Sequence, residues 1–238
     1  MKYTAASKPA RHADGANPAE KPGNKLPRSG KVVGRKTVPP GEVRIIGGQY
    51  KRSKLPVADR PGLRPTPDRV RETLFNWLGH DLSGWRCADV FAGTGVLGFE
   101  AASRGAAEVI LGEQDPVLVE KLKALQLKLK ATMVRVERSD GVSLLRRLPS
   151  GSQQLVFIDP PFDTALYEPA LKAAAQAIHP AGLVYLEAPK PWTDDELLEF
   201  GLQVRKSAKA GAVYFHLLGR PEAIAADNAH DAGTAESA

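Results

Sequence analysis

The stretch DVFAGTGVLG, residues 89–98, decides the fold. Its first three residues end a short strand predicted at residues 87–91, and its glycine-rich turn leads into a helical pattern that ends near Arg104. Glycine lets the backbone turn sharply and lets a ligand approach closely. Exposed N–H groups at the helix start favour an electron-rich ligand group. Gly93 to Gly98 match the G-x-G-x-x-G fingerprint, so the stretch predicts a strand–turn–helix unit that binds a nucleotide-like ligand.

An acidic residue stands where such a ligand would place its ribose. Glu113 lies twenty residues beyond Gly93 and follows a second predicted strand, residues 108–112. A carboxylate at this point can accept hydrogen bonds from both ribose hydroxyls. The glycine loop and Glu113 together fit either a nicotinamide cofactor or S-adenosylmethionine, and the loop alone does not choose between them.

The same alternation of strand and helix continues along the chain. Helices are expected at residues 116–130, 141–148, 165–178 and 194–200, with strands at 133–136, 155–158 and 183–186. The run at 155–158 is apolar throughout, which is typical of a strand buried on both faces. Residues 202–206 and 213–218 flank Lys209–Gly211 and predict a hairpin. This order predicts a parallel α/β sheet that takes in one antiparallel strand from the hairpin.

Upstream of the glycine loop, the pattern predicts a small hairpin and a helix. Residues 44–48 and 54–57 are expected as short strands next to a Gly-Gly turn. The helix is expected to begin with Thr66 as its N-cap and Pro67 at its first position. Its apolar face is expected to consist of Val70, Leu74, Trp77 and Leu78.

Charge is unevenly distributed over the 238 residues, which carry 33 Lys and Arg against 27 Asp and Glu. Residues 1–40 hold nine basic residues and two acidic ones, whereas residues 221–238 hold only acidic ones. Both ends lack large apolar residues and are predicted to be disordered. A basic arm on a nearly neutral body is an electrostatic footprint for nucleic acid, although a solvated tail is the alternative interpretation.

Several protein classes are excluded by composition. One cysteine, Cys87, cannot form an internal disulfide, and the five histidines fall in no metal-ligand spacing. No stretch approaches the roughly 20 apolar residues of a membrane span, and the N-terminus does not resemble a secretory signal. We therefore expect a cytoplasmic protein without a membrane segment or a bound metal.

A second loop, Asp159-Pro160-Pro161-Phe162, follows the buried strand at 155–158. In open α/β sheets, ligands bind at the carboxyl ends of the strands, so this loop should face the glycine loop. Asp159 and the carbonyl of Pro160 can accept hydrogen bonds from an exocyclic amine and favour its pyramidal transition state. Phe162 offers a face for base stacking, and Phe91 could face a sulfonium. The alternative is that the prolines only end the strand.

These motifs carry a resemblance to a known family. Residues 89–95 are similar to the first motif of class I S-adenosylmethionine-dependent methyltransferases, and residues 159–162 resemble the amino-methyltransferase signature (Asp/Asn)-Pro-Pro-(Tyr/Phe/Trp). The stretches 44–48, 63–66 and 69–76 are more specific. Together they resemble the bacterial 16S ribosomal RNA guanine-N2 methyltransferase family, RsmD, over about residues 43–220.

The resemblance implies an α/β fold with a Rossmann-like, seven-stranded methyltransferase sheet, mostly parallel, with an antiparallel strand from the C-terminal hairpin and a small N-terminal β-hairpin. It divides the chain into a disordered basic arm (1–40), a hairpin extension (41–65), a methyltransferase domain (66–220) and a disordered acidic tail (221–238). The implied protein is a monomer that methylates the N2 amine of a guanine in 16S ribosomal RNA or the small ribosomal subunit.

The resemblance also implies roles for individual residues. Asp89, Gly93 and Gly95 would contact the methionine end of S-adenosyl-L-methionine, Glu113 would hold its ribose, and Asp140 would meet its adenine amine. Asp159 and Pro160 would orient the guanine N2, and Phe162 would stack on the base. Thr66 and Phe91 complete the expected cofactor site. RNA contacts are expected from Arg44, Lys51, Arg52, Arg64 and Arg69.

Three alternatives remain at this point. An adenine-N6 or cytosine-N4 methyltransferase can share the Asp-Pro-Pro-aromatic loop, but DNA enzymes of this kind usually carry a separate recognition region, for which no segment is long enough. A nicotinamide-dependent oxidoreductase would give Asp159 and Phe162 no role. A nonenzymatic RNA-binding protein would keep its function when Asp159 is replaced by alanine.

Overall fold

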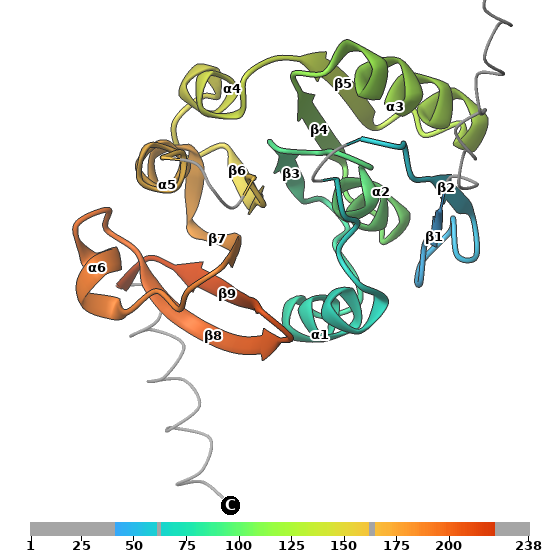
Figure 1. The fold of residues 1–238 in the computed structure, drawn as a ribbon. Coiled ribbons are helices and arrows are strands. Elements are labelled where there is room, and N and C mark those ends of the chain that lie inside the picture. The colour runs from blue at the N-terminus through green and yellow to red at the C-terminus, as the bar shows by residue number, and fades with distance from the viewer. Residues whose placement is uncertain (1–40, 61–62, 162–164, 222–238) are drawn as a thin grey trace, which may run out of the picture. The chain divides into compact units, whose positions relative to one another are not determined.

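The computed structural model describes residues 41–60, 63–161 and 165–221 (Figure 1). The predictions for the basic arm, for nearly all of the acidic tail and for Phe162 fall outside these residues. Two sheets and six helices are present in the described part of the chain.

The main sheet has seven strands in the order β5-β4-β3-β6-β7-β9-β8. Five of them, β3 to β7, run parallel to one another, whereas β9 is antiparallel to both β7 and β8. The predicted α/β sheet with an antiparallel hairpin strand is therefore confirmed. The strand bounds are β3 Arg86–Asp89, β4 Glu108–Glu113, β5 Val134–Arg138, β6 Gln153–Ile158, β7 Ile178–Ala188, β8 Gln203–Ala210 and β9 Val213–Gly219.

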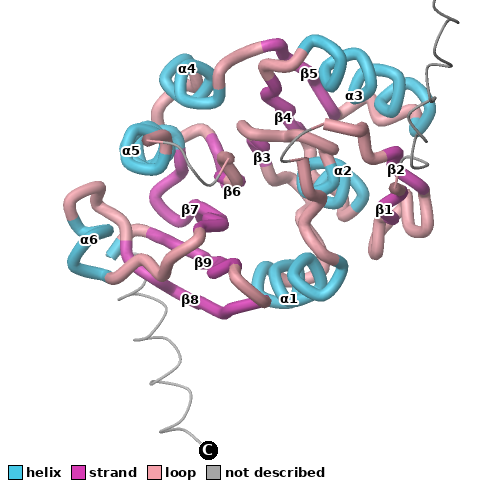
Figure 2. The backbone as a smooth tube through the Cα atoms, viewed as in Figure 1, coloured by secondary structure: helices cyan, strands magenta, loops and turns pink. Residues whose placement is uncertain are grey.

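Helices cover both faces of this sheet (Figures 1 and 2). One apolar cluster unites a sheet face with α1 (Asp68–Leu78), α2 (Val96–Ser103) and α3 (Pro116–Leu129). A second cluster unites the other face with α4 (Gly141–Arg147), α5 (Tyr167–Ala177) and α6 (Asp194–Leu198). The central strands are consequently buried on both sides, as the apolar run in β6 predicts.

The strand order creates a switch point between β3 and β6. From β3 the chain builds outward through β4 to β5, and it then crosses back to place β6 on the other side of β3. Asp89 at the end of β3 pairs in register with Phe157 of β6. The loops that follow these two strands therefore leave the sheet side by side, where open α/β sheets bind ligands.

The small sheet pairs β1 (Glu42–Arg44) with β2 (Lys54–Pro56) in antiparallel fashion. The predicted small hairpin is confirmed, but its first strand ends at Arg44, so the expected strand bounds of 44–48 are wrong. The N–H groups of Ile46 and Gly47 donate to the Glu100 carboxylate of α2 at 2.9 and 2.8 Å. They therefore do not take part in the hydrogen bonds of a strand pair. Gly48 lies so close to α2 that a Cβ there would meet the Ser103 carbonyl oxygen at 1.8 Å.

The start of α1 also differs from the prediction. Pro67 occupies the N-cap and no side chain caps the helix, so Thr66 is not the N-cap. Its hydroxyl is engaged with Glu187, and its carbonyl accepts a hydrogen bond from Nε of Arg71 at 3.1 Å. The buried face of α1 consists of Val70, Arg71, Leu74 and Phe75, whereas Trp77 and Leu78 are only partly buried.

The C-terminal hairpin is longer than expected. Strand β8 extends to Ala210, and the turn lies at Gly211 with a φ of +62°, so Lys209 and Ala210 belong to the strand. Strand β7 likewise begins at Ile178, directly after α5, instead of at residue 183. These changes lengthen elements without altering the order of the sheet.

Candidate functional site

A cavity of about 1050 Å³ opens at the carboxyl ends of β3, β4, β6 and β7. Its wall comes from the segment before α1, the glycine loop, the end of β4, the turn before α4, the loop after β6 and the tip of the β8–β9 hairpin. Small-molecule sites usually measure roughly 300–1,000 Å³. The cavity can therefore hold a cofactor together with part of a second substrate.

The glycine loop forms one wall of this cavity. Gly93 and Gly95 have φ values of +51° and +75°, which favour glycine. Gly93 lines the cavity, whereas Gly95 caps α2 and packs beneath the loop, where a Cβ would meet Leu122 at 2.5 Å. At Gly98 a Cβ would meet Leu111 at 2.2 Å, so this glycine permits close packing of α2 on the sheet.

Glu113 fastens the glycine loop to β4. Its Oε2 accepts a hydrogen bond from the Gly93 N–H at 2.9 Å, and its Oε1 accepts from the N–H groups of Gln114 and Asp115 at 2.8 and 2.9 Å. Two carboxylate oxygens offer about four acceptor positions. The half-buried side chain on the cavity wall therefore keeps capacity for one more donor, such as a hydroxyl.

Asp89 lies at the end of β3 and is buried. Its Oδ2 accepts the Gly98 N–H at 3.0 Å, which ties the strand to the start of α2. Burial raises the pKa of Asp89 to about 7, with the Gly98 hydrogen bond opposing the rise and the charges of Glu113 and Glu187 adding to it. The predicted site residue is thus present on the cavity wall, where it also has a structural role.

The loop after β6 forms the opposite wall. Asp159, Pro160 and Pro161 all line the cavity, so the structure brings the two predicted loops together. Burial raises the pKa of Asp159 well above its usual range, and repulsion from Glu187 and Asp89 adds to the effect. Phe162, the predicted stacking residue, is outside the described residues.

Glu187 is a candidate residue that sequence reasoning missed. It lies in β7, is only 4% exposed and lines the cavity. The Tyr185 hydroxyl donates to its Oε1 at 2.8 Å, and the Thr66 hydroxyl is a second partner. Burial raises the pKa of Glu187, while the hydrogen bonds from Tyr185 and Thr66 oppose that rise. The available signal was an acidic residue directly after the apolar run 183–186.

The remaining predicted cofactor residues divide into two groups. Thr66 and Phe91 line the cavity, as expected. Asp140 does not: its Oδ1 accepts the Ser143 N–H at 2.8 Å and caps α4, while its neighbours Ser139 and Gly141 line the wall. A role for Asp140 toward an adenine amine therefore stays a prediction.

Of the five predicted RNA-binding residues, the structure brings one to the cavity. Arg64 lines it, whereas Arg69 is exposed in the first turn of α1. Arg44, Lys51 and Arg52 are exposed on and beside the small sheet, away from the cavity wall. Arg60, another basic residue of the segment before α1, also lines the cavity and pairs with Asp115 at 2.9 Å.

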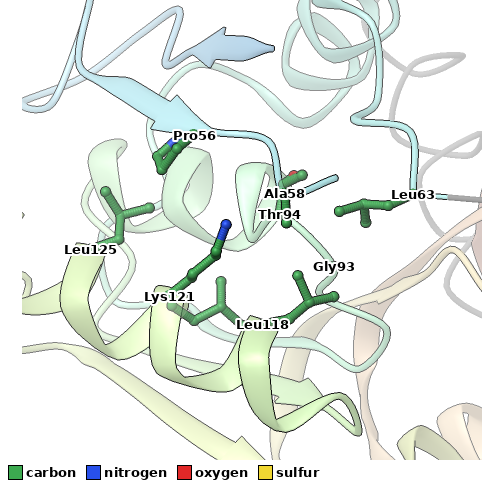
Figure 3. A pocket seen from close by; sticks show the side chains of 9 residues that line it. Pro56, Ala58, Leu63, Gly93, Thr94, Leu118, Lys121 and Leu125 are labelled. Atoms are coloured by element: carbon green, nitrogen blue, oxygen red, sulfur yellow. The ribbon is translucent and has the colours of Figure 1, made fainter. Parts of the chain in front are cut away.

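The segment after β2 packs over the glycine loop and α3 (Figure 3). Pro56, Ala58 and Leu63 approach Leu118, Lys121 and Leu125 there, with Gly93 and Thr94 between them. A Cβ at Gly93 would meet Leu63 at 2.9 Å. The cleft in this place measures about 10 Å³, room for no more than a single water. The packing of this segment therefore holds the glycine loop in position.

Two further properties concern the part of the chain that the structure describes. No group of three or more His, Cys, Asp or Glu side chains there could hold a metal ion. No helix there is long and apolar enough to cross a membrane. Cys87 is buried in β3, and burial raises the pKa of its thiol.

Comparison with known proteins gives a consistent result. A family model described as "Conserved hypothetical protein 95" matches residues 43–218. An Escherichia coli K12 protein named "Ribosomal RNA small subunit methyltransferase D" is 49% identical over 128 residues, which cover 54% of this chain and 64% of that protein. A Haemophilus influenzae protein of the same name is 42% identical over 155 residues, covering 63% of this chain and 80% of that protein. The match thus spans less than two thirds of the E. coli relative.

Solved structures extend the likeness to the fold. A putative methyltransferase from E. coli superposes with a TM-score of 0.65 at 36% identity, covering 76% of this chain and 98% of the other. A putative methylase from H. influenzae gives a TM-score of 0.63 at 34% identity, covering 76% and 99%. The seven-stranded arrangement is therefore the one found in methyltransferases.

Proposed function

The chain belongs to the family described as conserved hypothetical protein 95, and from this premise we propose that it methylates the N2 amine of a guanine in 16S ribosomal RNA with S-adenosyl-L-methionine. The observation that carries the proposal is the shared cavity, into which both the glycine loop and the Asp159-Pro160 loop open. Relatives named for ribosomal RNA small subunit methylation support the substrate class.

The glycine-loop wall fits the cofactor. Gly93 leaves the wall without a side chain, Glu113 keeps an acceptor position for a ribose hydroxyl, and Phe91 offers a ring that favours a cation. Asp89 completes this side of the cavity, and Thr66, whose hydroxyl binds Glu187, lines the cavity from the segment before α1. The cofactor, when bound, supplies an electrophilic methyl group on a positively charged sulfur.

The Asp159 wall fits an exocyclic amine. Such an amine is a weak nucleophile because its lone pair is delocalised into the ring. Acceptors at Asp159 and at the Pro160 carbonyl favour the pyramidal nitrogen that attacks. When the nitrogen gains its methyl group it must release a proton, and Asp159 is the acceptor. The raised pKa makes its carboxylate a stronger base than an exposed aspartate.

Exposed basic side chains at the cavity and on the small sheet suit an RNA partner. Arg64 stands at the cavity itself, and Arg69, Arg44, Lys51 and Arg52 are exposed beyond it. Lysine and arginine bind phosphates by displacing counterions, which anchors RNA without reading its sequence. The basic arm, residues 1–40, adds to this attraction in the proposal.

Nucleoside analysis tests the reaction. The full chain is incubated with labelled S-adenosyl-L-methionine and small ribosomal subunits that lack guanine-N2 methylation, and the digested RNA is analysed by mass spectrometry. The proposal expects N2-methylguanosine from the parent protein and none from Asp159→Ala. N6-methyladenosine as the product would refute the guanine target, and no methylated nucleoside on subunits or naked RNA would refute the activity.

A further inference from the structure

Glu187 has no part in the reaction as proposed above, yet its setting is unusual for a structural residue. Its carboxyl group is almost entirely buried and lies on the wall of the cavity beside Asp159. A buried carboxyl group is costly unless partners satisfy it. Its partners are Tyr185 and Thr66, and both present hydroxyl groups.

Sheet register brings Glu187 of β7 next to Asp159. Ile158, the last residue of β6, pairs with Leu186 of β7, so Asp159 is the first residue after β6 and Glu187 is the next residue along β7. Neighbouring strands lie about 4.8 Å apart. Side chains alternate along a strand, so Glu187 points to the same side of β7 as Tyr185. Both carboxyl groups line the cavity, and they lie close enough for the charge of Glu187 to raise the pKa of Asp159.

The surroundings hold the Glu187 carboxylate in a fixed orientation. Tyr185 is fully buried, and its ring contacts those of Phe157 and Phe215 at centroid distances of 6.1 and 6.5 Å. Its hydroxyl therefore has little freedom when it donates to Glu187. Two hydroxyl donors use part of the acceptor capacity of a carboxylate, and the remainder is available to a ligand in the cavity.

Two adjacent acceptors suit the hydrogen-bonding edge of guanine. Guanine carries neighbouring donors there, N1–H and the N2 amine. Adenine instead presents an acceptor at N1 beside its amine, and its lone pair would face the carboxylate. A polar site that pairs with a substrate N–H strongly rejects analogues that lack it.

We propose that Glu187 determines base specificity by accepting the N1–H of the target guanine while Asp159 accepts from its N2 amine. This inference rests on the proposed function, because it assigns a recognition role within the same cavity. Glu187 is then a specificity-determining residue, and the proton released from N2 still goes to Asp159.

A base analogue tests the role of N1–H. The methylated guanine, located by nuclease mapping of the labelled RNA, is replaced by 2-aminopurine, which keeps the C2 amine but lacks the hydrogen on N1 and the C6 oxygen. A contact to the C6 oxygen made by any other residue affects the parent and the Glu187 variants alike. We expect the parent to favour guanine over 2-aminopurine by about 10- to 100-fold in kcat/KM. Glu187→Gln should bring this ratio to within about threefold of one, because its amide can donate to N1 of the analogue.

Matched variants separate recognition from folding. Glu120→Gln removes an exposed carboxylate on α3, whose partner is Lys123, and should leave the ratio unchanged. Glu187→Asp keeps the charge but withdraws it from the base, so it should lower kcat/KM for guanine and reduce the ratio while preserving thermal stability better than Glu187→Gln.

The outcomes separate the specificity role of Glu187 from the proposed methylation of guanine. A ratio in both Glu187 variants equal to that of the parent would overturn the inference while leaving the proposed function in place, since a structural role lowers activity on both bases alike. A parent protein that does not methylate the guanine RNA would overturn the proposed function and the inference with it.

Discussion

The two walls of the cavity are built in different ways. On the glycine-loop wall, carboxylates bind backbone N–H groups: Glu113 accepts from Gly93, and Asp89 accepts from Gly98. On the opposite wall, Glu187 is held by the hydroxyls of Tyr185 and Thr66. The first wall therefore depends mainly on backbone shape, which glycine permits, and the second depends on side chains brought from distant parts of the chain.

This difference fits two separate functions, one for each wall. A backbone-built wall suits a cofactor that is the same in every turnover. The pKa of Asp89 is raised as well, but its carboxylate is tied to the Gly98 N–H. On the opposite wall two buried carboxyl groups, Asp159 and Glu187, lie close together with raised pKa values, which suits a step in which a proton moves. Variants in the two walls should accordingly affect different measurements.

Asp159→Ala gives the largest expected effect. Loss of the acceptor for the amine should lower the rate of methyl transfer by about 1,000-fold, within the 10²–10⁴-fold range for a positioned acid or base. Single-turnover kinetics with labelled cofactor and small subunits measure this rate. A rate equal to that of the parent would contradict the proposed role of Asp159.

Arg71→Met tests the support of the side-chain wall. Arg71 is fully buried, bonds the Thr66 carbonyl at 3.1 Å and pairs with the buried Glu100 at 3.1 Å. Its removal leaves Glu100 with Arg104 as its remaining cation and should lower the free energy of unfolding by about 3 kcal/mol. Urea denaturation measures the loss.

The control for Arg71 is Arg86, which pairs with Glu108 at 2.8 Å on the surface. Arg86→Met should cost less than about 1 kcal/mol, because exposed ion pairs contribute little. Equal losses for the two variants would mean that the buried network does not stabilise this wall.

Gly95→Ala tests the backbone wall, with a smaller effect. A side chain there must adopt a φ of +75° and would lie 2.5 Å from Leu122. Strain and crowding together should cost about 2 kcal/mol. Gly211→Ala is the matched control, since its φ is +62° but no atom outside the adjacent residues lies within 4 Å of a Cβ placed there. If both variants lose the same stability, close packing under the loop contributes nothing.

The sheet, the glycine-loop wall and Asp159 could be predicted from the sequence. Alternating apolar and helical patterns predict the sheet, and the glycine spacing predicts the backbone wall, because these are local signals. Asp159 is found for the same reason, since its loop is a contiguous motif. Cys87 is buried as its apolar neighbours suggest.

The misses are residues whose role depends on distant partners. Arg71 is polar, and its burial depends on Glu100, 29 residues away. The position of Glu187 depends on the register of β6 and β7 and on its hydrogen bond with Thr66. Because the Thr66 hydroxyl binds Glu187, it does not cap α1. Residues 46 and 47 do not form a strand because Glu100 binds their N–H groups. Such long-range pairings cannot be inferred from local pattern.

The most direct test of the two-wall account is a titration of S-adenosyl-L-methionine into the parent, Glu113→Ala and Asp159→Ala. The account predicts that Glu113→Ala weakens cofactor binding by about tenfold or more, because a charged acceptor is lost. It predicts that Asp159→Ala binds within about threefold of the parent although its rate of methyl transfer falls by about 1,000-fold. Weakened binding in Asp159→Ala together with unchanged binding in Glu113→Ala would contradict the division of the cavity.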